Sequence, residues 1–212
     1  IQSEGIARNL GSFSRFMDLA ASQCGELLSY SAIGSETSTP AKTVQGYYEI
    51  LEDTLLGIKL QPWRKSIRKR LNAHPKFYFF DVGVYRTLRP MGPLEAPEEV
   101  DGIALETLFL QEFIALNSAF DFGYKIFYWR TSNGKEVDFV LYGPKGLLSF
   151  EIKRTSRITS TMLGGLKSFL ADYPMAKAYF VYGGNRRMYE DKIEIVPVLE
   201  ILRNLKRLLA RQ

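Results

Sequence analysis

Three charged residues in the second half of the sequence have the types and spacing of a hydrolytic site. Asp138 lies in the run GKEVDFVL, and Glu151 and Lys153 lie in the run SFEIKR. Both runs are typical of strands, and residues 143–146 between them have the composition of a turn. The hairpin register that this turn sets places Asp138 opposite Glu151, and Glu136 opposite Lys153.

Two carboxylates that face each other across a hairpin require compensation. Directly opposed residues of an antiparallel pair have Cβ atoms about 4.5 to 5.5 Å apart, so like charges there destabilise the sheet. Strict strand alternation places Asp138 and Val140 on one face of the first strand, and Val137 and Phe139 on the other. A shared proton or a divalent cation would relieve the repulsion between Asp138 and Glu151.

A third carboxylate, Glu106, extends this candidate site. In the helical run DGIALETLFLQEF it shares an apolar face with Phe113, and this face should pack on the sheet. A buried acid is costly unless it is paired or bound to a metal. We therefore expect Glu106, Asp138 and Glu151 to bind Mg²⁺ or Mn²⁺, hard cations that prefer oxygen ligands. Lys153 would orient or deprotonate a metal-bound water, and the chemistry that suits this set is phosphodiester hydrolysis.

The composition excludes several other classes of site. The 212 residues contain one cysteine, Cys24, and one histidine, His74. These counts exclude a disulfide framework, a zinc site built from several thiolates and a metal site built from several histidines. No apolar run reaches the roughly 18 residues of a membrane span, and the first residues lack the pattern of a signal peptide. We expect a soluble, cytoplasmic protein without a membrane partner.

Residues 1–89 predict a winged helix-turn-helix domain. The apolar spacing predicts three helices, over residues 12–25, 31–34 and 40–57. In the third helix, Ser38 or Thr39 is the expected N-cap, Pro40 the first helical residue and Gly57 the stop. The strand-like runs IKLQPW and KFYFFDVG follow. Three helices and a two-stranded hairpin are typical of this domain, whose third helix would enter a major groove of DNA.

A basic stretch joins the two strands of this hairpin. The net charge of the chain is +5, and no acidic residue occurs between Asp53 and Asp81. Such a block suits a polyanion, and we expect it to bind nucleic acid, with DNA favoured, through the phosphates. The expected contacts are Lys59, Arg64, Lys65, Arg68, Lys69, Arg70 and Lys76. The carboxylates of Glu49 and Glu52 favour backbone or shape binding over base readout. Docking of a protein partner is the alternative.

Residues 90–212 predict a second domain. The joint, residues 89–102, holds three prolines, two glycines and an acidic cluster. The order of helical and strand-like runs after it predicts a mixed sheet flanked by helices, so the fold class is α/β (α+β). One of these helices contains Gly164 and Gly165, and this costly pair predicts the close approach of another element.

Two sets of motifs resemble known families. GKEVDFVL followed by LLSFEIKR resembles the PD-(D/E)XK motif of restriction-endonuclease-like nucleases, with Val137 in the place of the proline. Five ordered motifs together resemble the C-terminal region of a family of prokaryotic AAA+ type ATPases; they are FSRFMDLAASQCGELLSYSAIG, KTVQGYYEILEDTLLG, KFYFFDVGVYRTL, GIALETLFLQEF and YWRTSNGKEVDFVL. In that family a P-loop module precedes a domain of unknown function made of a winged helix and a nuclease-like fold. The resemblance covers almost the whole chain.

The resemblance implies roles for particular residues and a partner. Glu106, Asp138, Glu151 and Lys153 map onto the nuclease-like site, with Arg130 and Glu136 beside it. The chain has no G-x-x-x-x-G-K-[ST] motif and begins at Ile1, so ATP is expected only in a separate N-terminal ATPase module. Two functions stay open. One is a magnesium-dependent nuclease; the other is an inactive nuclease fold that serves the ATPase as an interaction or regulatory module, with Lys153 and Arg130 neutralising the acids.

Overall fold

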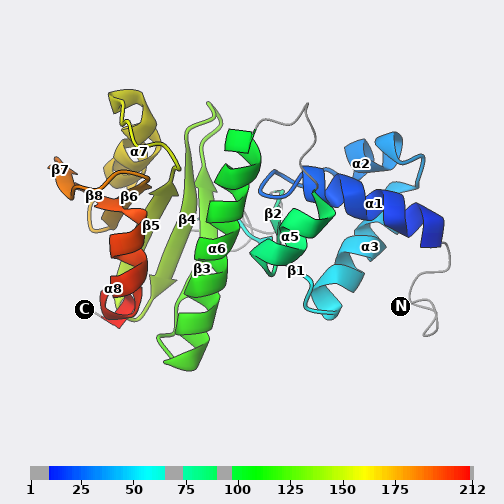
Figure 1. Ribbon diagram of the computed structural model, residues 1–212, viewed down its shortest axis with the longest axis horizontal. Coiled ribbons are helices and arrows are strands. Elements are labelled where there is room, and N and C mark those ends of the chain that lie inside the picture. Colours follow the sequence, from blue (N-terminus) through cyan, green and yellow to red (C-terminus); the bar gives the residue numbers. More distant parts are fainter. Residues whose placement is uncertain (1–9, 65–73, 90–96, 211–212) are drawn as a thin grey trace. The chain divides into compact units, whose positions relative to one another are not determined.

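The fold is α+β and divides into two compact units (Figure 1). The computed structural model describes residues 10–64, 74–89 and 97–210. Of these, residues up to 60 and residues 74–107 form the first unit, and residues 61–64 and 108–210 form the second. This division differs from the predicted joint at residues 89–102 in two ways. The chain already enters the second unit at Gln61. The helix α6, Pro97–Ala119, is divided between the units after Thr107.

The first unit contains helices packed with a two-stranded antiparallel sheet. The helices are α1 (Leu10–Ser22), α2 (Tyr30–Glu36), α3 (Ala41–Asp53) and α5 (Val82–Leu88), and the strands are β1 (Gly57–Leu60) and β2 (Lys76–Phe79). Tyr48 of α3 is fully buried, and its ring contacts those of Phe16 and Phe77 at centroid distances of 4.9 and 4.8 Å. The three helices and two strands expected here are confirmed.

The end of α3 differs from the prediction. Gly57 does not stop the helix, which ends at Asp53. Leu55 follows with φ of 58°, and the N–H of Leu56 donates to Leu51 O at 2.8 Å, which is the Schellman arrangement. Gly57 instead opens β1, where an added Cβ would lie 2.3 Å from the Phe77 ring. The glycine is thus required by packing in the strand.

Two further details of this unit correct the sequence interpretation. Pro40 occupies the N-cap position of α3 and no side chain caps the helix, so neither Ser38 nor Thr39 has the predicted role. The end of the run KFYFFDVG is helical, because α5 begins after Asp81. The Asp81 carboxylate accepts hydrogen bonds from backbone N–H groups of the first turn, at 2.8 and 3.0 Å.

The backbone conformation at Leu55 leads to a stability prediction. A non-glycine residue in the left-handed region costs about 1 kcal/mol or more, and Leu55 is 78% exposed, so its side chain contributes little packing. We expect Leu55→Gly to raise the free energy of unfolding by about 1 kcal/mol, or the melting temperature by about 2 to 4 °C. Leu55→Ala, which removes the side chain but keeps the strain, should leave the melting temperature unchanged in the same calorimetric scan. Equal effects of both variants would contradict the strain argument.

The second unit is built on a six-stranded mixed sheet. Its strands, in spatial order, are β3 (Lys125–Arg130), β4 (Glu136–Gly143), β5 (Gly146–Ile152), β6 (Lys177–Tyr182), β8 (Ile193–Pro197) and β7 (Met188–Glu190). The pairs β5–β6 and β6–β8 are parallel and the other pairs are antiparallel. A 3₁₀ helix, η1 (Ser160–Leu163), and the helices α7 (Gly164–Asp172) and α8 (Val198–Ala210) complete it. The predicted mixed sheet flanked by helices is confirmed.

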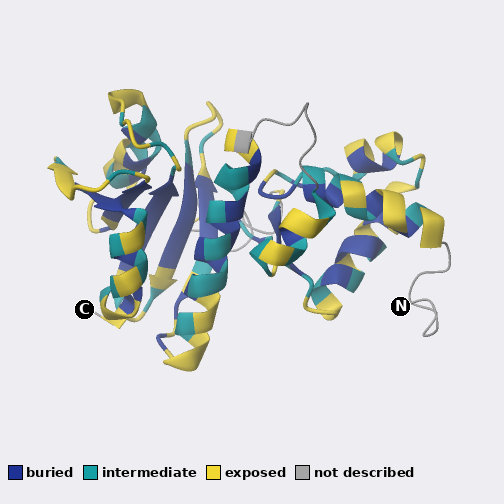
Figure 2. Cartoon of the chain, in the orientation of Figure 1, coloured by how far each residue is buried: buried dark blue, intermediate teal, exposed yellow. Residues whose placement is uncertain are grey.

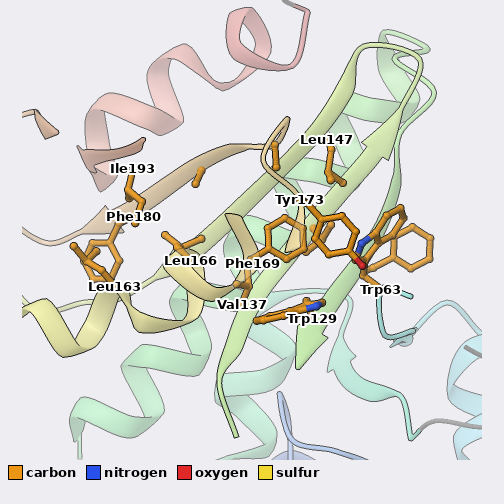
Figure 3. Close-up of a cluster of buried hydrophobic side chains, with 14 of the residues drawn as sticks. Trp63, Trp129, Val137, Leu147, Leu163, Leu166, Phe169, Tyr173, Phe180 and Ile193 are labelled. Atoms are coloured by element: carbon orange, nitrogen blue, oxygen red, sulfur yellow. The ribbon is translucent and has the colours of Figure 1, made fainter. Parts of the chain in front are cut away.

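Both faces of this sheet are covered. Its central strands β4, β5 and β6 are almost entirely buried, whereas the edge strand β7 is largely exposed (Figure 2). On one face, Val137 and Phe180 belong to a cluster with Phe169 of α7 (Figure 3). On the other, Phe113 of α6 contacts the Phe150 ring at a centroid distance of 4.8 Å. A strand residue that belongs to the α7 cluster therefore lies on the first face, and one that contacts α6 lies on the second. Paired residues on adjacent strands lie on the same face.

The segment after β1 adds to the edge of this sheet. Trp63 N–H donates to Tyr128 O at 2.5 Å, and Tyr128 N–H donates to Gln61 O at 3.1 Å. The Trp63 ring packs against those of Phe127 and Tyr173, at centroid distances of 5.4 and 5.9 Å. Part of the run that the sequence assigned to the first hairpin thus belongs to the second unit.

The described helices show no membrane-spanning character. The longest of them, α6, has 23 residues and carries several acidic side chains. None of the helices in the described ranges combines the length and the apolar composition that crossing a membrane requires.

Candidate active site

The hairpin β4–β5 positions the predicted site residues. Tyr142 lies opposite Leu147, and the pairing continues in the predicted register to Phe139 opposite Phe150. Gly143 and Gly146 also pair, so the loop is two residues shorter than expected. The predicted register is confirmed as far as the ladder extends.

A β-bulge interrupts β4 at Asp138. Phe127 of β3 lies opposite Val140 and Trp129 lies opposite Val137, so two residues of β4 share one place on the partner strand. Val137 and Val140 consequently face the same hydrophobic cluster, on the α7 side. Strict alternation, which put these valines on opposite faces, is wrong here. Bulges commonly re-aim a side chain beside a functional site.

The bulge turns the Asp138 carboxylate toward β5. The ladder ends at Phe139, so Asp138 and Glu151 are not the directly opposed pair that the sequence predicts. Instead, Asp138 Oδ2 accepts a hydrogen bond from Ile152 N–H at 2.7 Å. The side chain thus takes the place of a backbone acceptor, and it is only 4% exposed. A buried carboxylate bound to a backbone N–H is far less costly than an unsatisfied one.

Glu151 and Lys153 lie on the α7 face of β5. The register partner of Glu151 on β6 is Phe180, which belongs to the cluster on that face. Lys153 Nζ lies 2.8 Å from Glu151 Oε1 and 3.6 Å from Asp138 Oδ2. Its ammonium group therefore offsets the repulsion between the two buried carboxylates. Glu136, the predicted partner of Lys153, contacts Arg130 Nη1 at 3.1 Å.

This carboxylate–lysine cluster, Asp138, Glu151 and Lys153, combines burial with access to solvent. Glu151 is 7% exposed, whereas the Lys153 side chain is 37% exposed. The two acids and one base carry a net charge of −1, which suits a cation. In the described part of the chain, no group of three or more His, Cys, Asp or Glu side chains is arranged to hold a metal ion. Two carboxylates still fit Mg²⁺, which commonly binds through one or two carboxylates, waters and substrate phosphates.

Glu106 lies in the first unit and has a partner there. Glu106 Oε2 accepts a hydrogen bond from the Tyr78 hydroxyl at 2.9 Å, and the residue is 9% exposed. Tyr78 belongs to β2, and the sequence carries no local signal for this contact. The predicted role of Glu106 as a metal ligand stays a prediction.

The cysteine and the histidine also lie in the first unit. Cys24 is buried, and burial raises the pKa of its thiol to about 12. The thiol is therefore protonated at neutral pH and is a poor nucleophile. His74 is exposed, and its Nδ1 lies 2.8 Å from Leu28 O.

The predicted nucleic-acid contacts are placed in different environments. Lys59 pairs with Glu52 at 2.7 Å; burial lowers its pKa, but the hydrogen bond with Glu52 contributes to a net rise. Lys76 is 5% exposed. Lys76 is therefore buried and Lys59 is paired with Glu52, and the contacts of both lysines with nucleic acid stay predictions. Arg64 is exposed. The other predicted contacts, Lys65, Arg68, Lys69 and Arg70, lie outside the described residues.

Comparisons with known proteins match both halves of the chain. Residues 1–95 match a domain of unknown function, DUF8612, and residues 101–201 match another, DUF4143. The chain is 28% identical over 201 residues to the uncharacterized protein Mb2031c of Mycobacterium bovis and to the uncharacterized protein Rv2008c of Mycobacterium tuberculosis. Each match covers 93% of this chain but 44% of the relative, so the chain spans less than half the length of these proteins.

Proposed function

We propose that the chain is the effector part of an ATPase and that its second unit hydrolyses phosphodiester bonds of nucleic acid with the help of Mg²⁺. The observation that carries this proposal is the carboxylate–lysine cluster. Its acids come from adjacent strands, and a single lysine lies within 3.6 Å of both. A bulge and a side chain to backbone hydrogen bond hold Asp138 in place. Such support is expected of a site that must be preorganised.

The proposed mechanism assigns a role to each residue of the cluster. Asp138 and Glu151 would hold the cation; when bound, Mg²⁺ would supply charge stabilisation for the phosphate and a more acidic water. Lys153 has three donors on a flexible stem, so it can leave the carboxylates to orient the attacking water. The buried position of both acids would keep bulk water from screening their charges.

The first unit supports the nucleic-acid part of the proposal. Three helices followed by a two-stranded antiparallel sheet are the order of elements in a winged helix. In the sequence, positive charge concentrates between the two strands of this sheet, around Arg64, in a stretch without acidic residues that the unit division assigns to the second unit. The resemblance to the C-terminal region of AAA+ type ATPases adds an ATPase module as the proposed partner, where ATP would bind.

A nicking assay on supercoiled DNA tests the proposal. We expect the purified chain to cleave in Mg²⁺ or Mn²⁺ but not in EDTA, and Glu151→Gln to reduce the rate to background because it removes one charged ligand. The control is Glu190→Gln, which breaks the exposed Lys167–Glu190 pair of 2.6 Å and should leave the rate unchanged. Failure of the wild-type chain to cleave DNA or RNA in either metal would overturn the catalytic proposal.

The second candidate is an inactive nuclease fold that acts as an interaction module of the ATPase. The contacts of Lys153 with both acids favour it, since they compensate the buried charges without a metal. Titration calorimetry with Mn²⁺ separates the candidates. Binding that is lost in Glu151→Gln supports the enzyme, and no binding supports the interaction module.

A further inference from the structure

A surface cleft of about 560 Å³ opens beside the strand that carries the carboxylate–lysine cluster. Its volume is within the usual range of ligand-binding clefts, about 300 to 1,000 Å³. The cleft is lined by the end of β6, the start of β7 and the loops that follow β5 and β6. Its lining residues are Ser156, Ile158, Tyr182, Gly183, Gly184, Asn185, Arg186 and Met188. Lys153 N–H donates to Val181 O at 2.8 Å, and Gly183 N–H donates to Thr155 O at 2.9 Å. The two loops therefore leave the sheet side by side, directly after Lys153.

The charge of the cleft is positive. No aspartate or glutamate lines it. Arg186 is exposed on its wall, and exposed Arg157 lies between two lining residues of the other loop. Within the described ranges, no carboxylate forms an ion pair with either arginine, whereas the neighbouring Arg187 is neutralised by Glu194 and Glu200, at 2.5 and 2.9 Å. Two guanidinium groups are thus available to an anion.

Hydrogen bonds and close packing shape both loops in advance. The Tyr182 hydroxyl donates to Arg186 O at 2.6 Å and accepts from Arg186 N–H at 3.2 Å. A Cβ on Gly184 would lie 2.2 Å from the Tyr182 ring, and one on Gly183 would lie 2.1 Å from Arg154 O. In the other loop, the Thr155 hydroxyl bonds to both the N–H and the carbonyl of Arg157, at 3.1 and 3.0 Å. Preorganised loops lower the entropic cost of binding.

We propose that this cleft binds the sugar-phosphate backbone of the nucleic acid and leads it to the carboxylate–lysine cluster. The inference rests on the proposed function and names its substrate-binding surface. Phosphate oxygens are commonly bound by arginine, by serine and asparagine side chains and by backbone N–H groups, all of which occur here. The surface lies in the second unit and is formed by segments that follow β5 and β6.

Fluorescence anisotropy with a labelled duplex DNA, in EDTA and over a series of salt concentrations, tests this surface. We expect the full chain carrying Arg157→Ala and Arg186→Ala to bind more weakly. The slope of log affinity against log salt should be smaller in magnitude by about 1.8, which is the loss of two phosphate contacts at about 0.9 each. The control carries Arg203→Ala and Arg207→Ala on α8, which remove the same charge from exposed positions and should change the slope by less than half as much.

The outcomes separate this inference from the proposed function. An unchanged slope in the Arg157/Arg186 variant, or an equal change in the control, overturns the cleft as a binding surface even if the wild-type chain cleaves DNA. A reduced slope specific to the cleft variant supports it, because binding in EDTA does not depend on cleavage. A chain that binds through the cleft but never cleaves overturns the catalytic proposal alone. Circular dichroism of each variant verifies that these exposed substitutions preserve the fold.

Discussion

Asp138→Asn is expected to abolish metal-dependent cleavage while the chain stays folded. Asparagine keeps an oxygen that accepts the hydrogen bond from Ile152 N–H, at 2.7 Å in the wild type, but it removes the negative charge that a cation requires. Lys153 keeps its ion pair with Glu151. The expected result is a cleavage rate at background and a melting temperature close to that of the wild type.

Comparison of Asp138→Ala with Asp138→Asn separates the effect of the lost charge from the effect of the lost hydrogen bond. Alanine removes both, and the buried Ile152 N–H is left without its acceptor, which costs about 1 to 3 kcal/mol. Chemical denaturation should therefore show a loss of stability in the alanine variant that the asparagine variant lacks. Asp172→Asn, an exposed substitution at the end of α7, is the control for both measurements. Undiminished cleavage by Asp138→Asn would exclude Asp138 as a metal ligand.

Among the glycine-to-alanine substitutions in the second unit, Gly165→Ala is expected to be the most destabilising. A Cβ at this position would lie 1.8 Å from the carbonyl oxygen of Glu136, a backbone atom that cannot rotate away. Either α7 or the start of β4 must move, and overpacking typically costs about 1 to 3 kcal/mol, so we expect a loss of about 3 kcal/mol for this backbone clash. Because Glu136 precedes the bulge at Asp138 on β4, the shift should also reduce metal-dependent cleavage.

The adjacent glycine provides a matched control. An added Cβ at Gly164 meets nothing within 4 Å, so Gly164→Ala should be neutral or stabilise the chain by up to about 1 kcal/mol through its helix propensity. Urea unfolding of the two variants compares the same chemical change at neighbouring positions. Similar free energies of unfolding for both would contradict the close contact between α7 and β4.

The glycine pair illustrates how far the sequence can be interpreted. Two glycines within a helical pattern predict a close approach, and this prediction is confirmed for Gly165. The sequence cannot tell which glycine makes the contact, since that depends on where α7 meets β4. Gly57 shows the same limit, since the sequence does not show what packs against a glycine. It predicts that Gly57 stops a helix, whereas Gly57 opens β1 and packs against the Phe77 ring of the partner strand.

The sequence by itself determined the three helices and two strands of the first unit, the mixed sheet, the hairpin register and the choice of Asp138, Glu151 and Lys153 as candidates. These features depend on local periodicity and turn composition, which a single strand or helix carries within its own residues. Only the tertiary structure decided that a bulge re-aims Asp138, that Lys153 contacts both acids and that Glu136 pairs with Arg130. Each of these depends on how neighbouring strands are paired and where their side chains point. A shift of one residue in the pairing of β4 with β3 changes which side chains meet.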